Sequence, residues 1–252
     1  MKNVVVIIQA RMAASRLPGK VLEQLEGRPV LAWVVARALR AEQVSEVVVA
    51  TTDQPEDDVV AEFCEAEQIH HFRGSMHDVL DRYYHAAKQY KAEVVVRLTA
   101  DCPFIDPAEI DRLLAVFLAA DPPLDFAANR LPMHRTIPIG LDAEVCTMDA
   151  LETAWQEAVE PHQREHVMPF FYENTARFNT MHLTQRPDYG HLRWTVDTRQ
   201  DLDLVRQIAA HFDGRDDFSW KEILALYEKH PELAVVNEDV RHKDYREVDD
   251  RR

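Results

Sequence analysis

The sequence predicts an α/β protein with a doubly wound, mostly parallel sheet, and three observations support this class. Residues 4–8 form a short run of β-branched aliphatic side chains, which is typical of a strand buried on both faces. Further strands are expected at 44–50, 70–73 and 93–98. Helical patterns lie between these strands, at 30–41, 56–67 and 78–90. Strands and helices that alternate at this spacing indicate right-handed crossovers between parallel strands.

The second half of the chain follows this alternation less regularly. A helix is expected at 108–120, because Asp106 and Pro107 provide an N-cap and a first helical residue. Prolines then interrupt a region of short strands. The remaining expected elements are strands at 124–131, 140–147, 178–184 and 191–197 and helices at 148–159, 162–174, 201–211 and 220–230. We expect one domain over 1–238, with 121–185 as an inserted mixed β region, and a charged tail over 239–252.

Composition excludes several functional classes. The chain has 252 residues, with 29 Lys and Arg against 44 Asp and Glu, and its formal net charge of −15 argues against general binding to nucleic acids or anionic membranes. The three cysteines form no C-x-x-C pair, so neither a disulfide framework nor a cysteine zinc site is expected. No apolar run approaches the length of a membrane span, and the N-terminus leads directly into a strand. We therefore expect a cytoplasmic protein.

A cationic loop directly follows the first strand. Its polar side chains are those of Arg11, Ser15, Arg16 and Lys20. Open α/β sheets bind ligands at the carboxyl ends of their strands, and arginines with a lysine favour a ligand that carries several phosphate oxygens. The loop contains neither a Walker sequence nor a G-x-G-x-x-G fingerprint, so side-chain cations would bind the phosphates. A solvated loop with scattered charges is the alternative.

Two aspartates occupy similar positions at the ends of later strands. Asp101 follows the strand at 93–98, and Asp197 ends the strand expected at 191–197. Carboxylates that face the same crevice as a phosphate-binding loop are suited to Mg²⁺, which prefers oxygen ligands and shares itself with substrate phosphates. For Asp197 a turn or a helix N-cap is the alternative interpretation.

Six motifs in order over about 190 residues carry a resemblance to a known family. They comprise residues 9–12 with 15–22, 72–75 with 78–83, 97–103, 140–145, 164–167 and 194–198. Together they resemble the cytidylyltransferases that make CMP-activated acidic sugars, and within them the branch named after the spore coat polysaccharide biosynthesis protein F. The resemblance implies the nucleotide-diphospho-sugar transferase fold with a smaller mixed β region.

The resemblance also implies roles for individual residues. It implies that Lys20, Arg11 and Asp101 are catalytic and that Asp101 and Asp197 hold Mg²⁺. The nucleotide-binding residues that it implies are Gln9, Ala10, Arg11, Ser15, Arg16, Lys20, Arg73, Asp78, Thr99 and Ala100. The residues that it implies for the acceptor pocket are Asp142, Glu144, Arg164 and His166, for which a purely structural role is the alternative.

The reaction that the resemblance implies transfers CMP from CTP to a sugar or sugar acid and releases pyrophosphate. Such chemistry depends mainly on positioning and charge neutralisation. The expected partners are CTP and the acceptor, without nucleic acid or membrane, and a homodimer is possible. One alternative is a glycosyltransferase that uses a nucleotide sugar, although such enzymes usually carry a D-x-D element where this chain has Asp101, Cys102 and Pro103. The other is a non-catalytic nucleotide-binding module.

Overall fold

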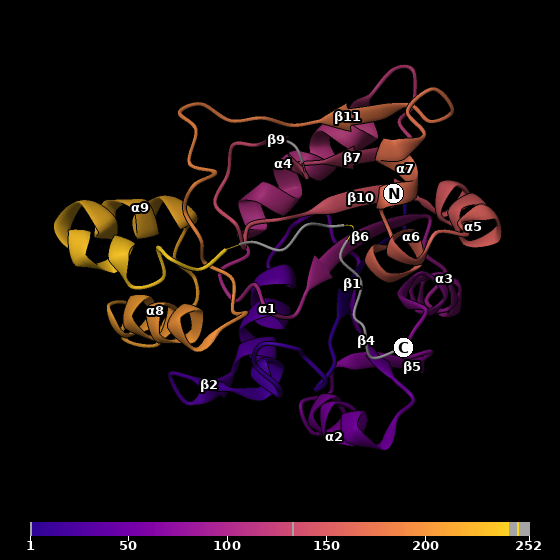
Figure 1. Ribbon diagram of the computed structural model, residues 1–252. Coiled ribbons are helices and arrows are strands. Elements are labelled where there is room, and N and C mark those ends of the chain that lie inside the picture. Colours follow the sequence, from indigo (N-terminus) through magenta and orange to yellow (C-terminus); the bar gives the residue numbers. More distant parts are fainter. Residues whose placement is uncertain (1, 133, 242–245, 247–252) are drawn as a thin grey trace.

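A seven-stranded sheet forms the centre of the protein, in the order β11-β7-β10-β6-β1-β4-β5 (Figure 1). The computed structural model describes residues 2–132, 134–241 and 246. The strands of the sheet are β1 (Val4–Gln9), β4 (Glu46–Thr52), β5 (His70–Gly74), β6 (Val94–Thr99), β7 (Phe126–Ala128), β10 (Glu144–Thr147) and β11 (Thr180–His182). Two small ribbons pair β2 (Gln24–Leu25) with β3 (Arg28–Pro29) and β8 (Arg130–Leu131) with β9 (His134–Arg135).

The sheet is mostly parallel, as the sequence predicts. Strand β1 pairs in parallel with β4 and β6, and β4 pairs in parallel with β5. Strand β10 is antiparallel to both β6 and β7, and β11 pairs in parallel with β7. The strands expected in the Pro-rich region therefore extend the central sheet at one edge and make that part of it mixed.

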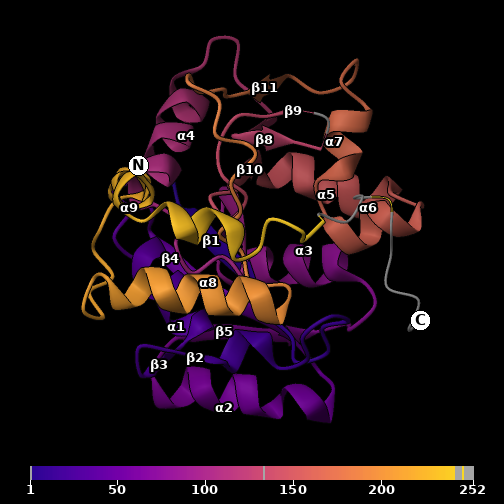
Figure 2. The ribbon, with the colours of Figure 1, turned by 60° about the vertical axis from the view of Figure 1, so that its left-hand side comes forward.

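Helices cover both faces of the sheet (Figures 1 and 2). The α-helices are α1 (Val30–Ala38), α2 (Asp58–Ala66), α3 (Val79–Gln89), α4 (Pro107–Ala119), α5 (Met148–Glu157), α6 (Pro161–His166), α7 (Pro169–Glu173), α8 (Arg199–Ala210) and α9 (Trp220–Lys229). The described residues also form three short 3₁₀ helices, η1 (Lys20–Leu22), η2 (Pro55–Asp57) and η3 (Pro231–Val235). The alternation of strands and helices confirms the doubly wound α/β class.

The side chains of β1 explain why its sequence is apolar without interruption. Val4, Val6 and Ile8 pack into the core cluster that contains α1, α2 and α4. Val5 and Ile7 point to the opposite face, into the cluster that contains α3, α5 and α7. Successive residues of a strand face opposite sides of the sheet, so a strand covered on both sides needs apolar residues at every position.

A third core cluster joins the C-terminal helices to the side of the sheet (Figure 2). Trp33 of α1, Phe104, Trp194 and Phe218 are buried in it together with the apolar faces of α8 and α9. This cluster fixes the segment around residue 197 next to the carboxyl ends of β1 and β6.

Two expected elements differ from the structure. The prediction of a strand at 191–197 is wrong, because this segment makes one isolated bridge between Ile139 and Arg193 within the described residues. Its N–H groups are divided among several acceptors instead of one neighbouring strand: that of Trp194 donates to Ile139 O, and that of Val196 to Asp101 O. The helix expected at 162–174 is divided into α6 and α7, because Pro169 cannot continue a preceding helix.

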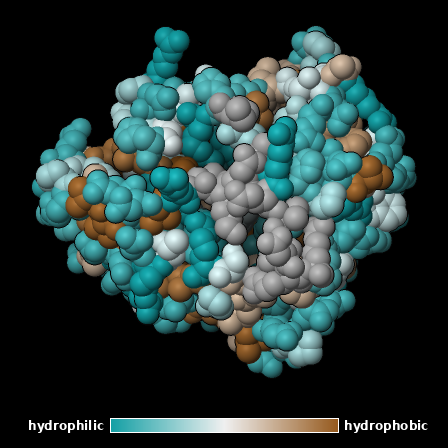
Figure 3. Space-filling view, in the orientation of Figure 1, coloured by the Kyte–Doolittle hydropathy of each residue, from teal (hydrophilic) through white to brown (hydrophobic). Residues whose placement is uncertain are grey.

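The surface agrees with the acidic, polar composition. Figure 3 shows that the face seen in Figure 1 is mostly hydrophilic, with its apolar residues in small separate groups. Among the described residues, no helix is long and apolar enough to cross a membrane. The charged tail expected at 239–252 lies largely outside the described residues, which include 239–241 and 246 of it.

Candidate active site

A cavity of about 310 Å³ lies at the carboxyl ends of the central strands β1 and β6. Neighbouring parallel strands end at the same edge of the sheet, and this is where open α/β sheets bind their ligands. The polar residues that line the cavity include Gln9, Arg11, Ser15, Arg16, Lys20, Arg82, Arg97, Thr99, Asp101, Arg130, Asp142, His166, Tyr172, Thr195 and Asp197.

The loop after β1 is folded back on itself by its own backbone. The carbonyl oxygen of Met12 accepts hydrogen bonds from Ala14 N at 2.9 Å and Gly19 N at 2.8 Å. Met12 N donates to Asp57 Oδ1 at 2.6 Å, which ties the loop to η2. Gly19 has a φ of 75°, a left-handed conformation that glycine adopts at little cost, and the chain then enters η1. This turn returns Lys20 to the end of the sheet.

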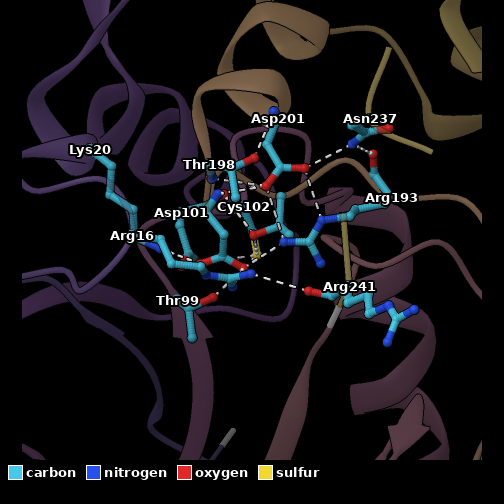
Figure 4. A network of polar contacts seen from close by, with 12 residues as sticks. Arg16, Lys20, Thr99, Asp101, Cys102, Arg193, Thr198, Asp201, Asn237 and Arg241 are labelled. Atoms are coloured by element: carbon cyan, nitrogen blue, oxygen red, sulfur yellow. Dashed lines mark hydrogen bonds and ion pairs between the residues drawn. The ribbon is translucent and has the colours of Figure 1, made fainter. Parts of the chain in front are cut away.

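Lys20 bonds to both of the aspartates that the sequence singles out, Asp101 and Asp197. Figure 4 shows Lys20 and Asp101 on the same side of the network. Its Nζ is 2.5 Å from Asp101 Oδ2 and 2.7 Å from Asp197 Oδ1. Burial alone would lower the pKa of Lys20, but the charges of Asp101 and Asp197 outweigh it and raise this pKa above its ordinary value. Lys20 is therefore a charged ammonium group at neutral pH.

The second carboxylate oxygen of Asp197 faces two further cations. Arg16 Nη2 lies 2.8 Å from Asp197 Oδ2, and Arg193 Nη2 donates to the same oxygen at 2.7 Å. Burial would raise the pKa of Asp197, but Lys20, Arg16 and Arg193 hold this pKa well below its usual range. Asp197 is thus ionised and held by cations on both of its oxygens.

The two aspartates fit a Mg²⁺ site shared with a substrate. One oxygen of Asp101 and one of Asp197 lie within 2.7 Å of the same ammonium nitrogen, so both carboxylates can face a single small cation. Across the described part of the chain, no group of three or more His, Cys, Asp or Glu side chains is spaced for a metal ion. Mg²⁺ commonly binds through one or two carboxylates and completes its coordination with water and phosphate oxygens.

Arg82 is a cavity residue that the sequence analysis did not assign to the site. It belongs to α3 and is 1% exposed. Within the described ranges its Nη1 donates to Ser75 O at 3.0 Å, and its Nε has no hydrogen-bond partner. Burial lowers the pKa of Arg82 to about 10. A buried guanidinium with spare donors at the cavity wall is suited to an anionic or carbonyl-bearing ligand.

The inner wall of the cavity carries a second set of buried charges. Arg97 Nη1 is 2.5 Å from Glu144 Oε2, and Arg130 lies 3.8 Å from Glu144 and 3.9 Å from Asp142. Arg135 Nη2 also donates to Asp142, at 2.9 Å. Burial would lower the pKa of Arg130, but Glu144 and Asp142 raise it above its ordinary value. Of these groups Arg97, Arg130 and Asp142 line the cavity, as does Glu165, so this wall offers both guanidinium donors and carboxylate acceptors.

The structure brings most of the predicted site residues to the cavity. Those that line it are Gln9, Ala10, Arg11, Ser15, Arg16, Lys20, Thr99, Ala100, Asp101, Asp142, His166 and Asp197.

The cavity lining does not include four predicted site residues, namely Arg73, Asp78, Glu144 and Arg164. Glu144 lies behind Arg97, to which it is paired. Arg164 of α6 pairs with Asp78, the N-cap of α3, and thereby joins these two helices. Arg73 donates to Thr52 O at 2.9 Å and pairs with Asp58 at the start of α2.

Two of the unassigned cavity residues had a signal in the sequence. Arg97 is a cation inside the otherwise apolar run of β6, and Arg82 occupies the buried stripe of α3 between Val79 and Ala86. A charged residue at a position where the strand or helix periodicity predicts a core residue is expected to have a partner or a ligand.

A doubly wound sheet, a cationic loop and two carboxylates around one cavity define a nucleotidyltransferase type of site. The family model of the cytidylyltransferases matches residues 5–240. The chain therefore belongs to the cytidylyltransferase family, and it is an enzyme of the nucleotidyltransferase class, as its motifs predict.

Similar proteins match this chain over nearly all of its length. An uncharacterized protein of Methanocaldococcus jannaschii is 37% identical over 251 residues, which cover 98% of this chain and 100% of that protein. The spore coat polysaccharide biosynthesis protein SpsF of Bacillus subtilis is 29% identical over 94% of this chain and 99% of its own. The structure of a cytidylyltransferase from Leptospira borgpetersenii superposes with a TM-score of 0.89 and 31% identity, covering 96% of this chain and 100% of that one.

Proposed function

We propose that this enzyme transfers CMP from CTP to a sugar or sugar acid in a Mg²⁺-dependent reaction that releases pyrophosphate. The observation that carries the proposal is the cluster of Lys20, Asp101 and Asp197 beside a cationic loop at the ends of β1 and β6. Membership of the cytidylyltransferase family supports the choice of a cytidine nucleotide. The similarity to a spore coat polysaccharide biosynthesis protein supports a carbohydrate acceptor.

The nucleotide would occupy the side of the cavity formed by the β1 loop and α3. Arg11, Ser15 and Arg16 would bind the phosphates of CTP, while the spare donors of Arg82 would bind its nucleoside part. The same side is lined by Gln9, Ala10, Thr99 and Ala100, at the adjacent ends of β1 and β6. The backbone at these positions borders the cavity and is suited to contact the base and ribose. An in-line attack on the α-phosphorus needs this kind of fixed orientation.

Lys20 would change partners during the reaction. In the free protein its ammonium group neutralises Asp101 and Asp197, and with CTP bound it would neutralise the departing pyrophosphate. Mg²⁺ held by Asp101 and Asp197 would offset the charge on the phosphate oxygens. Arg16 would remain beside Asp197 and contact the triphosphate from the loop.

The acceptor would lie against the inner wall of the cavity. Asp142 and His166 of the predicted acceptor residues line it, together with Arg130 and Tyr172. The guanidinium groups of Arg97 and Arg130 on this wall suit an acceptor that carries a carboxylate, and the carboxylate of Asp142 suits sugar hydroxyls.

One assay tests the proposed function. Purified enzyme is incubated with Mg²⁺, one nucleoside triphosphate at a time and a panel of sugars and sugar acids, and pyrophosphate release is measured. We expect release with CTP and an acceptor together, and loss of release in the Asp101→Asn variant or with EDTA. Release with another triphosphate in place of CTP would overturn the nucleotide assignment. Tight nucleotide binding without release for any acceptor would favour a binding module.

A further inference from the structure

We propose that Asp201, held by Arg193 and Asn237, is a positioning residue that fixes the Asp197 carboxylate in the orientation that metal binding requires. This inference rests on the proposed function, in which Asp197 is a metal ligand. It concerns the layer of side chains behind the cavity wall, which Figure 4 shows between the cavity residues and the C-terminal segment.

Asp201 is fully buried at the start of α8, with 0% of its surface exposed. Its Oδ2 accepts the backbone N–H groups of Asp197 and Thr198, each at 3.0 Å. Both of its oxygens also accept from Arg193, Oδ1 from Nε at 2.8 Å and Oδ2 from Nη2 at 3.1 Å. Asp201 thus fixes the backbone N–H groups of Asp197 and Thr198. It also fixes the Arg193 guanidinium, which contacts the Asp197 side chain.

Arg193 transmits this arrangement to the Asp197 carboxylate. Its Nη2 donates to Asp201 Oδ2 and to Asp197 Oδ2 at once, the latter at 2.7 Å. Because Oδ2 of Asp197 is bound on this side, Oδ1 faces Lys20 and, through it, Asp101. If Arg193 were free to rotate, Asp197 could present either oxygen, and the shared cation position would be lost.

Asn237 completes the layer from the C-terminal segment that follows η3. It is 6% exposed, and its Nδ2 donates to Asp201 Oδ1 at 2.8 Å and to Arg193 O at 3.1 Å. Four residues later the carbonyl oxygen of Arg241 accepts from Arg16 Nη1 at 3.1 Å. The C-terminal segment therefore contacts Asp201 and Arg193 through Asn237, and Arg16 of the loop through Arg241.

A helix-capping role alone does not account for these contacts. Thr198 and Asp201 form a capping box at the start of α8, and Ser219 with Glu222 forms the same box at the start of α9. Glu222 is exposed and completes its box through Ser219. Asp201 makes additional bonds to Arg193 and Asn237, which no helix cap requires. The two boxes provide a matched pair for an experiment.

The experiment compares Asp201→Asn and Asn237→Leu with the control Glu222→Gln in the full chain. Mn²⁺ binding is titrated by electron paramagnetic resonance in the presence of α,β-methylene CTP, and thermal unfolding is recorded in parallel. We expect Asp201→Asn to weaken Mn²⁺ binding by about 10- to 100-fold, the usual effect of losing the support behind a metal ligand, and Asn237→Leu by about 3- to 10-fold. Glu222→Gln is expected to bind Mn²⁺ as the wild type does.

The readout separates positioning from stability and from the proposed function itself. Asn237→Leu leaves the capping box intact, so it carries the test alone if Asp201→Asn does not fold. Unchanged Mn²⁺ affinity in folded Asn237→Leu, or an equal loss in Glu222→Gln, would overturn the positioning role. If the wild type binds no Mn²⁺ with the analogue, the proposed metal site fails first, and that failure is visible before any variant is compared.

Discussion

Two arginines are buried to nearly the same extent, and their hydrogen bonds distinguish a structural charge from one available to a ligand. Arg37 of α1 is 0% exposed, Arg82 of α3 is 1% exposed, and burial lowers the pKa of each to about 10. The Arg37 guanidinium donates to three backbone carbonyls, those of Ile105, Asp216 and Phe218, at 2.7, 2.5 and 2.8 Å. Each of the three guanidinium nitrogens of Arg37 thereby has a partner in the protein.

Arg82 has one hydrogen bond within the described residues and lines the cavity. Burial and pKa are alike for the two residues, so neither property identifies the functional one. The number of unused donors distinguishes the two residues. A buried donor without a partner costs free energy unless a ligand accepts its hydrogen bond. Substitutions in the cavity around Lys20 and Arg82 should therefore act on binding and turnover, and those in the structural cluster around Arg37 and Asp216 on stability.

The largest effect is expected for Lys20→Met. Removing a preorganised charge next to the transferred phosphate should lower turnover by about two to three orders of magnitude. Arg40→Met is the matched control, because Arg40 pairs with Asp216 in the structural cluster and does not line the cavity. Pyrophosphate release under saturating substrates measures both variants. Unchanged release in Lys20→Met would contradict its assigned role.

A large effect on stability, without one on binding, is expected for Arg37→Met. The substitution leaves the carbonyl oxygens of Ile105 and Phe218 without this donor, and Asp216 O keeps its second donor, Arg40. It also removes a cation that lies 4.8 Å from the ring of Phe218. We expect the free energy of unfolding to fall by about 2–4 kcal/mol. Urea unfolding measures the change, and CTP affinity measured well below the unfolding transition should be that of the wild type.

The reverse pattern is expected for Arg82→Met. The variant loses one backbone hydrogen bond but also a buried cation with an unpaired Nε, so its free energy of unfolding should be unchanged or slightly raised. CTP affinity, measured by calorimetry, should fall about tenfold because a charge-assisted contact is lost. A destabilised Arg82→Met with normal CTP affinity would show that Arg82 is structural, like Arg37.

The smallest effect concerns acid stability of the structural cluster. Burial would raise the pKa of Asp216, but hydrogen bonds from Arg28 and Arg40 lower it below its usual value. A carboxyl group with a lowered folded pKa stabilises the protein above its unfolded pKa of about 3.9, and this contribution is lost as pH falls through the folded pKa. The stability difference between wild type and Asp216→Asn should therefore be full at neutral pH and shrink below about pH 4. A difference that is constant with pH in urea unfolding would be inconsistent with this pKa.

The sequence was informative where local pattern and strand-end position decide the structure. The apolar run of β1 predicts a central strand, as the structure has it. Lys20 and Asp101 follow buried strands, which predicts that they meet at one edge of the sheet, and the structure places them in contact there. Asp197 lies at the same edge, in contact with Lys20, although the strand expected before it does not form. Its position depends on Trp194 and Val196, whose N–H groups bind distant carbonyls that no local pattern reveals.

Contacts between distant segments account for what the sequence did not predict. Asn237 lies 36 residues from Asp201, and nothing in the intervening pattern indicates that the two are hydrogen-bonded. Arg164 and Asp78, which are 86 residues apart in the sequence, are both predicted to contact a ligand. In the structure they pair with each other and connect α3 to α6. Long-range polar contacts of this kind depend on how helices pack, which charge and period along the chain do not specify.

The most direct test is a crystal structure of the enzyme with Mn²⁺ and α,β-methylene CTP, in which the anomalous signal locates the metal. We predict one Mn²⁺ between Asp101 and Asp197, with the triphosphate along Arg11 and Arg16 and with Lys20 Nζ moved from the carboxylates to a phosphate oxygen. A metal bound by other residues, or a triphosphate outside this cavity, would contradict the proposed site.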